Sequence, residues 1–163
     1  MEKDQKAKES NFLCTALSVH PAWKKAQTIA LFYPLPDEPF LLPLLTLKSA
    51  TWCFPDWDFQ GMVFRRWTPS PLSLPEKDPV RPPRDALEIP PEKIDLILVP
   101  GIAFDALGGR LGRGAGFYDR YLSQSTLRAH KTGVGFSVQK VPHVPRECWD
   151  ISLDEVLFGQ TSF

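Results

Sequence analysis

The segment DLILVPG at residues 95–101 is followed closely by a glycine-rich segment, GGRLGRGAGFYDR, at residues 108–120. An unbroken apolar run closed by Pro-Gly is typical of an interior strand of a parallel sheet, because both faces of such a strand are covered and polar alternation is lost. Ligands of these sheets bind beyond the carboxyl ends of the strands. The order of strand and glycine loop therefore predicts a ligand site at that edge of the sheet.

The glycine-rich loop contains the residue types that phosphate binding requires. Its glycines permit positive φ and leave backbone N–H groups accessible to an anion. Arg110 and Arg113 provide planar cations that match phosphate oxygens. Asp119 provides a hard oxygen ligand for Mg²⁺, which typically binds one or two carboxylates together with substrate phosphates. The spacing fits neither a Walker A loop nor the dinucleotide fingerprint. A glycine-rich turn whose arginines pair with surface acids stays open as the alternative.

These residues resemble the 5-formyltetrahydrofolate cyclo-ligases, also named methenyltetrahydrofolate synthetases. That family has a hydrophobic strand, then Pro-Gly-x-Ala/Gly-Phe-Asp, then Arg-Leu-Gly-x-Gly-x-Gly-x-Tyr-Asp. The two motifs stand here at residues 100–105 and 110–119. The resemblance continues upstream through AQTIALFYPLPDE at residues 26–38 and downstream to Asp150, and it covers the chain from about residue 10 to the end.

The resemblance implies a ligase that forms a carbon–nitrogen bond, with ATP as co-substrate and Mg²⁺ as cofactor. In this family ATP transfers its γ-phosphoryl group to the formyl oxygen of 5-formyltetrahydrofolate, and N10 then closes the ring to give 5,10-methenyltetrahydrofolate. The protein positions both substrates and neutralises charge on the phosphoryl group, so no catalytic side chain need act as a covalent nucleophile.

The resemblance also implies roles for particular residues. Asp119 and Asp150 are expected to hold Mg²⁺, and Tyr33 and Glu38 to contact the folate. The residues expected to bind ATP are Arg110, Leu111, Gly112, Arg113, Gly114, Ala115, Gly116, Phe117 and Tyr118. Those expected to line the folate site as well are Arg113, Gly114, Ala115, Gly116 and Phe117. Structural alternatives are a helix-start acid for Asp119 and solvated loop acids for Asp150 and Glu38. Tyr118 could equally be a core ring.

Composition narrows the classes of function. Lys plus Arg and Asp plus Glu number 19 each, so no net positive field favours a nucleic-acid backbone. The three cysteines form no Cys-x-x-Cys pair, which argues against a disulfide framework and a zinc site. The charged N-terminus differs from a signal peptide, and no apolar run is long enough to span a membrane. We therefore expect a cytoplasmic monomer that binds neither nucleic acid nor membrane.

Residues 1–163 suit a single domain, in which the basic N-terminal helix of the family is expected to be shortened or absent. The hydrophobic pattern predicts an α/β fold: a three-layer sandwich with a mixed, largely parallel sheet and helices on both faces. Helices are expected around residues 12–17, 40–48 and 116–123, and strands at 28–33, 51–54, 62–67, 94–99, 132–136 and 156–158. Two connections are expected, a loop at 55–61 and an extended, proline-rich surface segment at 69–91.

Two other classes of function stay open. A folate- or nucleotide-binding paralogue without catalysis would keep the glycine loop, and it would bind its ligands without turnover. Another phosphate-ester enzyme on a similar sheet, such as a sugar-phosphate isomerase or a coenzyme A transferase, would place a catalytic carboxylate in the site and would not need ATP. Dependence on ATP separates this last class from the cyclo-ligases.

Overall fold

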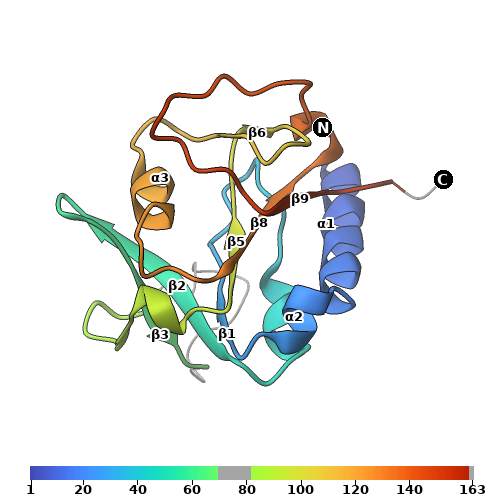
Figure 1. Ribbon diagram of the computed structural model, residues 1–163. Coiled ribbons are helices and arrows are strands. Elements are labelled where there is room, and N and C mark those ends of the chain that lie inside the picture. Colours follow the sequence, from blue (N-terminus) through green and yellow to red (C-terminus); the bar gives the residue numbers. More distant parts are fainter. Residues whose placement is uncertain (70–81, 162–163) are drawn as a thin grey trace.

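The computed structural model describes residues 1–69 and 82–161, which fold around a seven-stranded sheet (Figure 1). The strand order is β4-β3-β2-β1-β5-β8-β9. The strands of this sheet are β1 (Thr28–Ala30), β2 (Thr51–Asp58), β3 (Gly61–Trp67), β4 (Glu88–Ile89), β5 (Leu96–Val99), β8 (His130–Gly135) and β9 (Glu155–Phe158). Two further short strands, β6 (Ala103–Phe104) and β7 (Arg110–Leu111), form a separate antiparallel hairpin beyond β5.

The sheet is mixed and largely parallel. From β2 through β1, β5 and β8 to β9 every neighbouring pair is parallel, whereas β3 and β4 join antiparallel at one side. Helices α1 (Lys3–Ser18) and α2 (Pro21–Lys25) lie on one face, and α3 (Phe117–Leu122) lies on the other (Figure 1). Short 3-10 helices are η1 (Leu42–Thr46), η2 (Pro91–Lys93) and η3 (Ser137–Gln139). The expected three-layer α/β architecture is confirmed.

Strand β5 is covered on both faces, as its unbroken apolar sequence predicts. Leu96 and Leu98 belong to the hydrophobic cluster that contains residues of α1, whereas Ile97 and Val99 belong to the cluster that contains residues of α3. None of these four side chains is more than 1% exposed. The strand therefore lies at the centre of the molecule, and its carboxyl end delivers the chain to the β6–β7 hairpin and the glycine loop.

The expected loop at residues 55–61 is wrong, because β2 runs on to Asp58 and forms a long hairpin with β3. Pro55 lies opposite Phe64 within this hairpin. Pairing of β2 with β1 ends at Cys53, so beyond that point β3 is the only strand paired with β2 among the residues that the structure describes. A proline is tolerated at such an edge because its missing N–H removes no bond to a second strand.

Other element boundaries differ from expectation in smaller ways. Strand β1 ends at Ala30, because residues 31–38 leave the sheet. The apolar stretch at 40–48 forms a 3-10 turn, and α2, β6 and β7 were not expected. The proline-rich connection contains the short elements β4 and η2, while its residues 70–81 lie outside the described part of the chain.

In residues 1–69 and 82–161 no helix is both long and apolar enough to cross a bilayer.

Phe104 joins the β6–β7 hairpin to the main sheet. Its ring is fully buried and packs on Gly133 and Gly135 of β8, where an added Cβ atom would approach ring carbons to 3.0 Å. The two glycines therefore provide the space that the ring fills. Close packing of this kind fixes the hairpin against the core, and with it the point from which the glycine loop begins.

We expect Phe104→Ala to lower the free energy of unfolding by about 3–5 kcal/mol, because it removes a buried ring and leaves a cavity. Phe59→Ala is the matched control, since Phe59 is 96% exposed at the tip of the β2–β3 hairpin, and it should change stability by less than about 0.5 kcal/mol. Urea titration followed by circular dichroism measures both. A similar small loss in the two variants would show that the ring does not anchor the hairpin.

Candidate active site

A cavity of about 440 Å³ opens at the carboxyl edge of the sheet, within the range of about 300–1,000 Å³ that is usual for small-molecule sites. Every residue predicted for the site lines it: Tyr33, Glu38, Arg110, Leu111, Gly112, Arg113, Gly114, Ala115, Gly116, Phe117, Tyr118, Asp119 and Asp150. These residues come from the segment after β1, from the glycine loop with the start of α3, and from the segment before β9. The structure thus brings together three stretches that are distant in sequence.

One wall of the cavity was not expected from the sequence. Pro55, Trp57 and Met62 line it from the β2–β3 hairpin, and Trp57 is paired directly with Met62 across the two strands. Tyr33 stacks on the buried ring of Phe54, with ring centroids 4.6 Å apart. Interpreting residues 51–67 as one hairpin would have placed these side chains on a common face. The cavity is therefore apolar and aromatic on this side.

Beyond Leu111, the course of the glycine loop depends on two residues with positive φ. Gly114 has φ of +99° and Gly116, which directly precedes α3, has φ of +70°. An added Cβ at Gly114 would meet no atom within 4 Å. Backbone conformation, and not lack of space, therefore requires glycine there.

Arg110 is held against the wall of the cavity and is almost fully buried. Its side chain is 6% exposed, and Nη1 donates to the carbonyl oxygen of Pro100 at 3.2 Å. The guanidinium carbon lies 5.4 Å from the ring centroid of Tyr118, and Nη2 lies 3.5 Å from Oδ2 of Asp119. The cation is thus fixed in place by a carbonyl and a ring, with a carboxylate at the limit of hydrogen bonding.

Arg113 takes a different position and bridges two acids. Its Nη2 donates to Oδ1 of Asp37 at 2.7 Å and to Oε1 of Glu38 at 3.1 Å. The hydrogen bond from Arg113 lowers the pKa of Asp37. The other oxygen of Glu38 accepts from the backbone N–H of Leu35 at 2.9 Å. Arg113 therefore closes one side of the cavity by joining the glycine loop to the segment that follows β1.

The hydroxyl group of Tyr118 is buried beside the cavity and has no hydrogen-bond partner among the described residues. Burial raises the pKa of this hydroxyl, and the nearby Arg110 opposes the shift only in part. The group therefore stays protonated at neutral pH and retains a hydrogen to donate. A buried donor without a partner is costly in a folded protein, which makes the hydroxyl a candidate contact for a ligand.

Asp119 and Asp150 line the same cavity from different elements. Asp119 lies in the first turn of α3 and its side chain is 24% exposed. Asp150 accepts a hydrogen bond from the N–H of Glu147 through Oδ2 at 2.7 Å. Across residues 1–69 and 82–161 no three His, Cys, Asp or Glu side chains are grouped as a metal site. Two carboxylates fit Mg²⁺, which completes its shell with substrate phosphates and water.

Asp105, which the sequence did not single out for the site, lies beneath this edge of the sheet. Its side chain is 2% exposed and accepts from backbone N–H groups on both sides, among them Gly109 at 2.8 Å and Val144 at 2.9 Å. Arg146 donates to Oδ1 at 3.2 Å. Burial acts to raise the pKa of Asp105, but the backbone hydrogen bonds and the Arg146 charge outweigh it and hold the pKa at about 2.

Fold and cavity together define an α/β protein in which an arginine- and glycine-rich loop lies beside an aromatic wall. The family model for the 5-formyltetrahydrofolate cyclo-ligase family matches residues 1–159. The chain belongs to this family, whose members are ligases that form a carbon–nitrogen bond.

Relatives and solved structures agree with this membership. A mouse 5-formyltetrahydrofolate cyclo-ligase is 28% identical over 97% of this chain and 86% of its own length. The structure of an Aquifex aeolicus 5,10-methenyltetrahydrofolate synthetase is similar with a TM-score of 0.81 and 31% identity, covering 97% of this chain and 81% of that one. A Mycoplasma pneumoniae 5,10-methenyltetrahydrofolate synthetase shares the fold, with a TM-score of 0.75 and 23% identity over 96% of this chain and 88% of that one.

The lowered pKa of Asp105 predicts a specific loss of stability in acid. Its folded-state pKa of about 2 lies below the ordinary value of about 3.9, so the ionised group stabilises the fold above about pH 4 and this contribution is lost as the pH falls towards 2. The difference corresponds to about 2.5 kcal/mol. Between about pH 5 and pH 2, the free energy of unfolding of the wild type should fall more steeply than that of Asp105→Asn. Parallel pH profiles from urea titrations would contradict this.

Proposed function

We propose that this protein converts 5-formyltetrahydrofolate to 5,10-methenyltetrahydrofolate in a reaction that requires ATP and Mg²⁺. The observation that carries the proposal is the single cavity in which the arginine–glycine loop, two carboxylates and an aromatic wall meet. Membership of the cyclo-ligase family supplies the reaction. The arrangement supplies a place for an anionic nucleotide beside a place for a flat aromatic substrate.

The glycine loop is the proposed ATP site. Arg110 is already held beside Asp119, so a phosphate bound there would lie next to the Arg110 cation and close to a Mg²⁺ ion held by Asp119. Arg113 would exchange its acidic partners for phosphate oxygens. A partly exposed ion pair such as that with Asp37, which is 56% exposed, contributes only about 0–1 kcal/mol, whereas a hydrogen bond to a charged group contributes about 1.5–3 kcal/mol. Leaving Asp37 would therefore cost little, whereas Glu38, which is 4% exposed, would need another donor in place of Arg113.

The aromatic wall and Glu38 are the proposed folate site. The fused ring of a folate is flat and largely apolar on its faces, which suits the stacked Tyr33 and the exposed ring of Trp57. The edge of the fused folate ring carries N–H groups that can donate hydrogen bonds. Glu38 presents a carboxylate that is 4% exposed, and release of Arg113 from it would leave an acceptor for those donors.

The proposed chemistry needs no covalent intermediate on the protein. The formyl oxygen attacks the γ-phosphorus and ADP leaves; N10 then attacks the formyl carbon, and the oxygen leaves with the phosphate group. Arg110 and Arg113 would stabilise the charge on the transferring group, and the Tyr118 hydroxyl would donate a hydrogen bond to it. Mg²⁺, held by Asp119 and Asp150, would supply further neutralisation of the phosphates.

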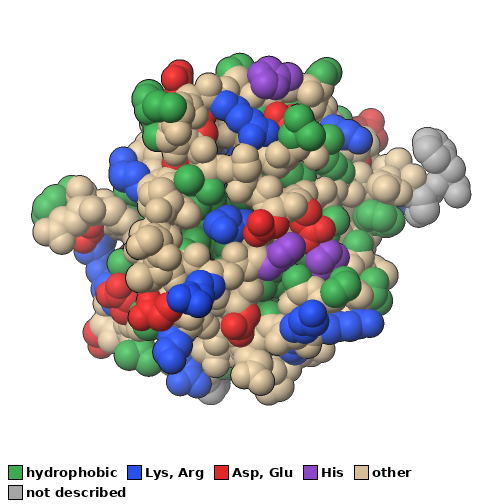
Figure 2. Space-filling model, viewed as in Figure 1, with side chains coloured by type: hydrophobic (Ala, Val, Ile, Leu, Met, Phe, Trp, Pro, Cys, Tyr) green, Lys and Arg blue, Asp and Glu red, His purple; other side chains and the backbone are tan. Residues whose placement is uncertain are grey.

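We also propose that the protein acts as a monomer in the cytoplasm. The three cysteines are free thiols, which is usual in a reducing compartment. On the face shown in Figure 2, cationic and anionic side chains are interspersed, without a broad area of one sign.

Purified protein with Mg²⁺ and ATP should convert 5-formyltetrahydrofolate to the methenyl compound. The ultraviolet absorbance of the methenyl product measures the reaction, and omission of ATP is the control. Folate binding in calorimetry without any absorbance change would favour the non-catalytic binding protein. Turnover of a phosphate ester without ATP would favour an isomerase or transferase.

Asp119→Asn should retain the fold and lose most of the turnover, because the amide keeps the size of the side chain but not the charge that holds Mg²⁺. Removal of a metal ligand is expected to cost at least about 100-fold in activity at low Mg²⁺, with partial recovery as Mg²⁺ is raised. Asp4→Asn is the matched control, since Asp4 also lies in the first turn of a helix but does not line the cavity. Unchanged activity of Asp119→Asn across a Mg²⁺ titration would remove this residue from the metal site.

A further inference from the structure

The segment that carries Asp150 has no helix or strand of its own between residues 141 and 154. It crosses the top of the molecule over the β6–β7 hairpin (Figure 1). Two backbone hydrogen bonds join it to the hairpin, from Val141 N to Phe104 O and from Leu153 N to Gly108 O, both 2.9 Å. The position of Asp150 therefore depends on what fastens this segment between those two points.

Asp105 fastens the crossing segment to the β6–β7 hairpin. Through Oδ1 it accepts from the N–H groups of Leu107 at 2.9 Å and Gly109 at 2.8 Å, which fix the turn of the hairpin. Through Oδ2 it accepts from the N–H of Val144 at 2.9 Å, which belongs to the crossing segment. One buried carboxylate thus binds both pieces of chain at once.

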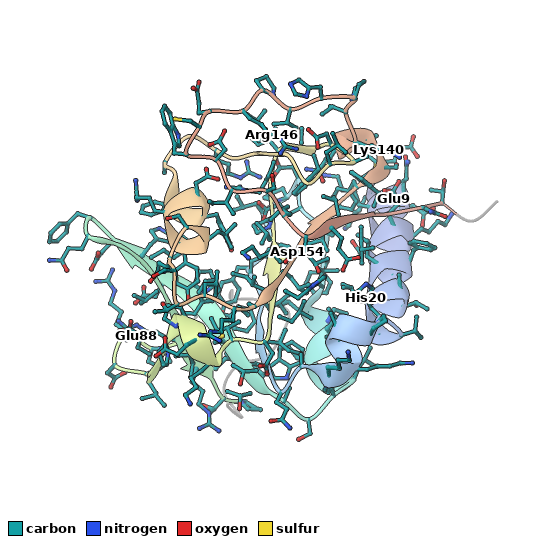
Figure 3. The ribbon with its side chains drawn as sticks, viewed as in Figure 1. Glu9, His20, Glu88, Lys140, Arg146 and Asp154 are labelled. Carbon is teal, nitrogen blue, oxygen red and sulfur yellow. The ribbon has the colours of Figure 1, made fainter. Side chains whose placement is uncertain are left out.

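Arg146 reinforces the same junction from the crossing segment. In addition to Asp105, its Nη2 donates to the carbonyl oxygen of Leu107 at 3.2 Å, and its Nη1 donates to Oγ of Ser152 at 2.6 Å. Figure 3 shows Arg146 lying where the segment crosses the hairpin. The approach is close, because an added Cβ at Gly108 would lie 2.3 Å from the carbonyl oxygen of Leu153. The junction therefore has little room for alternative packing.

We propose that Asp105 is a positioning residue that sets the separation of the two magnesium ligands, Asp119 and Asp150. The inference rests on the proposed function, since that function makes these carboxylates the ligands. Asp119 is placed by α3, whose Tyr121 and Leu122 are buried in the core. Asp150 lies in a segment without helix or strand, and it is placed by its local turn with Glu147, by Ile151 and Leu153, which pack against the core on its far side, and by the junction at Asp105 on its near side.

The expected effect follows from the geometry that Mg²⁺ demands. The ion requires near-octahedral oxygen ligands at about 2.0–2.1 Å, so a ligand on a loosened segment binds it less well. Groups that orient metal ligands without touching the metal typically contribute about 10- to 100-fold in metal affinity. Asp105 should act in this way through the backbone of residues 144–153 and not through contact with the ion.

Three variants test the proposal. Asp105→Asn keeps the size of the side chain but loses its charge and one acceptor oxygen. Arg146→Gln is milder, because Arg146 is partly exposed and supplies only one of the donors to Asp105, so it serves if Asp105→Asn fails to fold. Asp95→Asn is the matched control: Asp95 also accepts two backbone N–H groups, from Gln27 and Thr28, but at the opposite end of β5.

The first measurement is amide hydrogen exchange without metal. Residues 143–153 should exchange about tenfold faster in Asp105→Asn, with a smaller increase in Arg146→Gln, because local opening becomes easier. Exchange in α3 should be unchanged in both variants, and Asp95→Asn should match the wild type throughout residues 143–153. Unchanged exchange of the segment in a folded Asp105→Asn or Arg146→Gln would overturn the proposal.

The second measurement is the affinity for Mn²⁺, in place of Mg²⁺, with a non-hydrolysable ATP analogue bound, followed by electron paramagnetic resonance of the free ion. Asp105→Asn should bind Mn²⁺ about tenfold more weakly, while its affinity for the analogue without metal stays that of the wild type. Faster exchange with unchanged Mn²⁺ affinity would overturn the positioning role. Equal Mn²⁺ affinity in the wild type and Asp119→Asn would instead refute the metal site of the proposed function, and hydrogen exchange alone would then decide whether Asp105 fastens the segment.

Discussion

Parallel pairing of β1, β5 and β8 is the constraint on which the rest of the structure depends. Parallel strands end at the same edge of a sheet, so the segments that leave them must meet there. The segment after β1 brings Glu38, the segment after β5 brings the glycine loop, and the connection from β8 to β9 brings Asp150. The cavity forms because these three connections meet at one edge of the sheet. Its charged side chains belong to the connections and not to the strands of the main sheet.

The features that could be predicted from the sequence are those with local causes. The apolar run of β5 indicates burial on both faces, and the glycine loop indicates positive φ; the structure has both. The anion site that the loop indicates stays a prediction. The grouping of Glu38 with the glycine loop was predicted from the family motifs, because no local pattern connects them. Their roles in binding stay predictions, whereas their place in one cavity is observed.

What could not be predicted depends on contacts between distant residues. Pro55 indicated a loop, because a single sequence does not show that β2 has lost its second neighbouring strand at that point. Since the hairpin was not predicted, the cavity wall formed by Trp57 and Met62 was not predicted either. The role of Asp105 could not be predicted for the same reason. It precedes a turn, where an aspartate is ordinary, and the partners that make it a junction, Val144 and Arg146, lie 39 and 41 residues further along the chain.

The three thiols differ in their burial, so a thiol-directed reagent can modify one of them selectively. Cys14 and Cys53 are buried, and burial raises the pKa of both, that of Cys14 to about 11, so neither offers an accessible thiolate. Cys148 is exposed, two residues before Asp150 in the segment that Asp105 fastens. A thiol-directed fluorophore would therefore attach at one position without any engineered cysteine. Its emission would report directly on the movement of that segment as ligands enter the cavity.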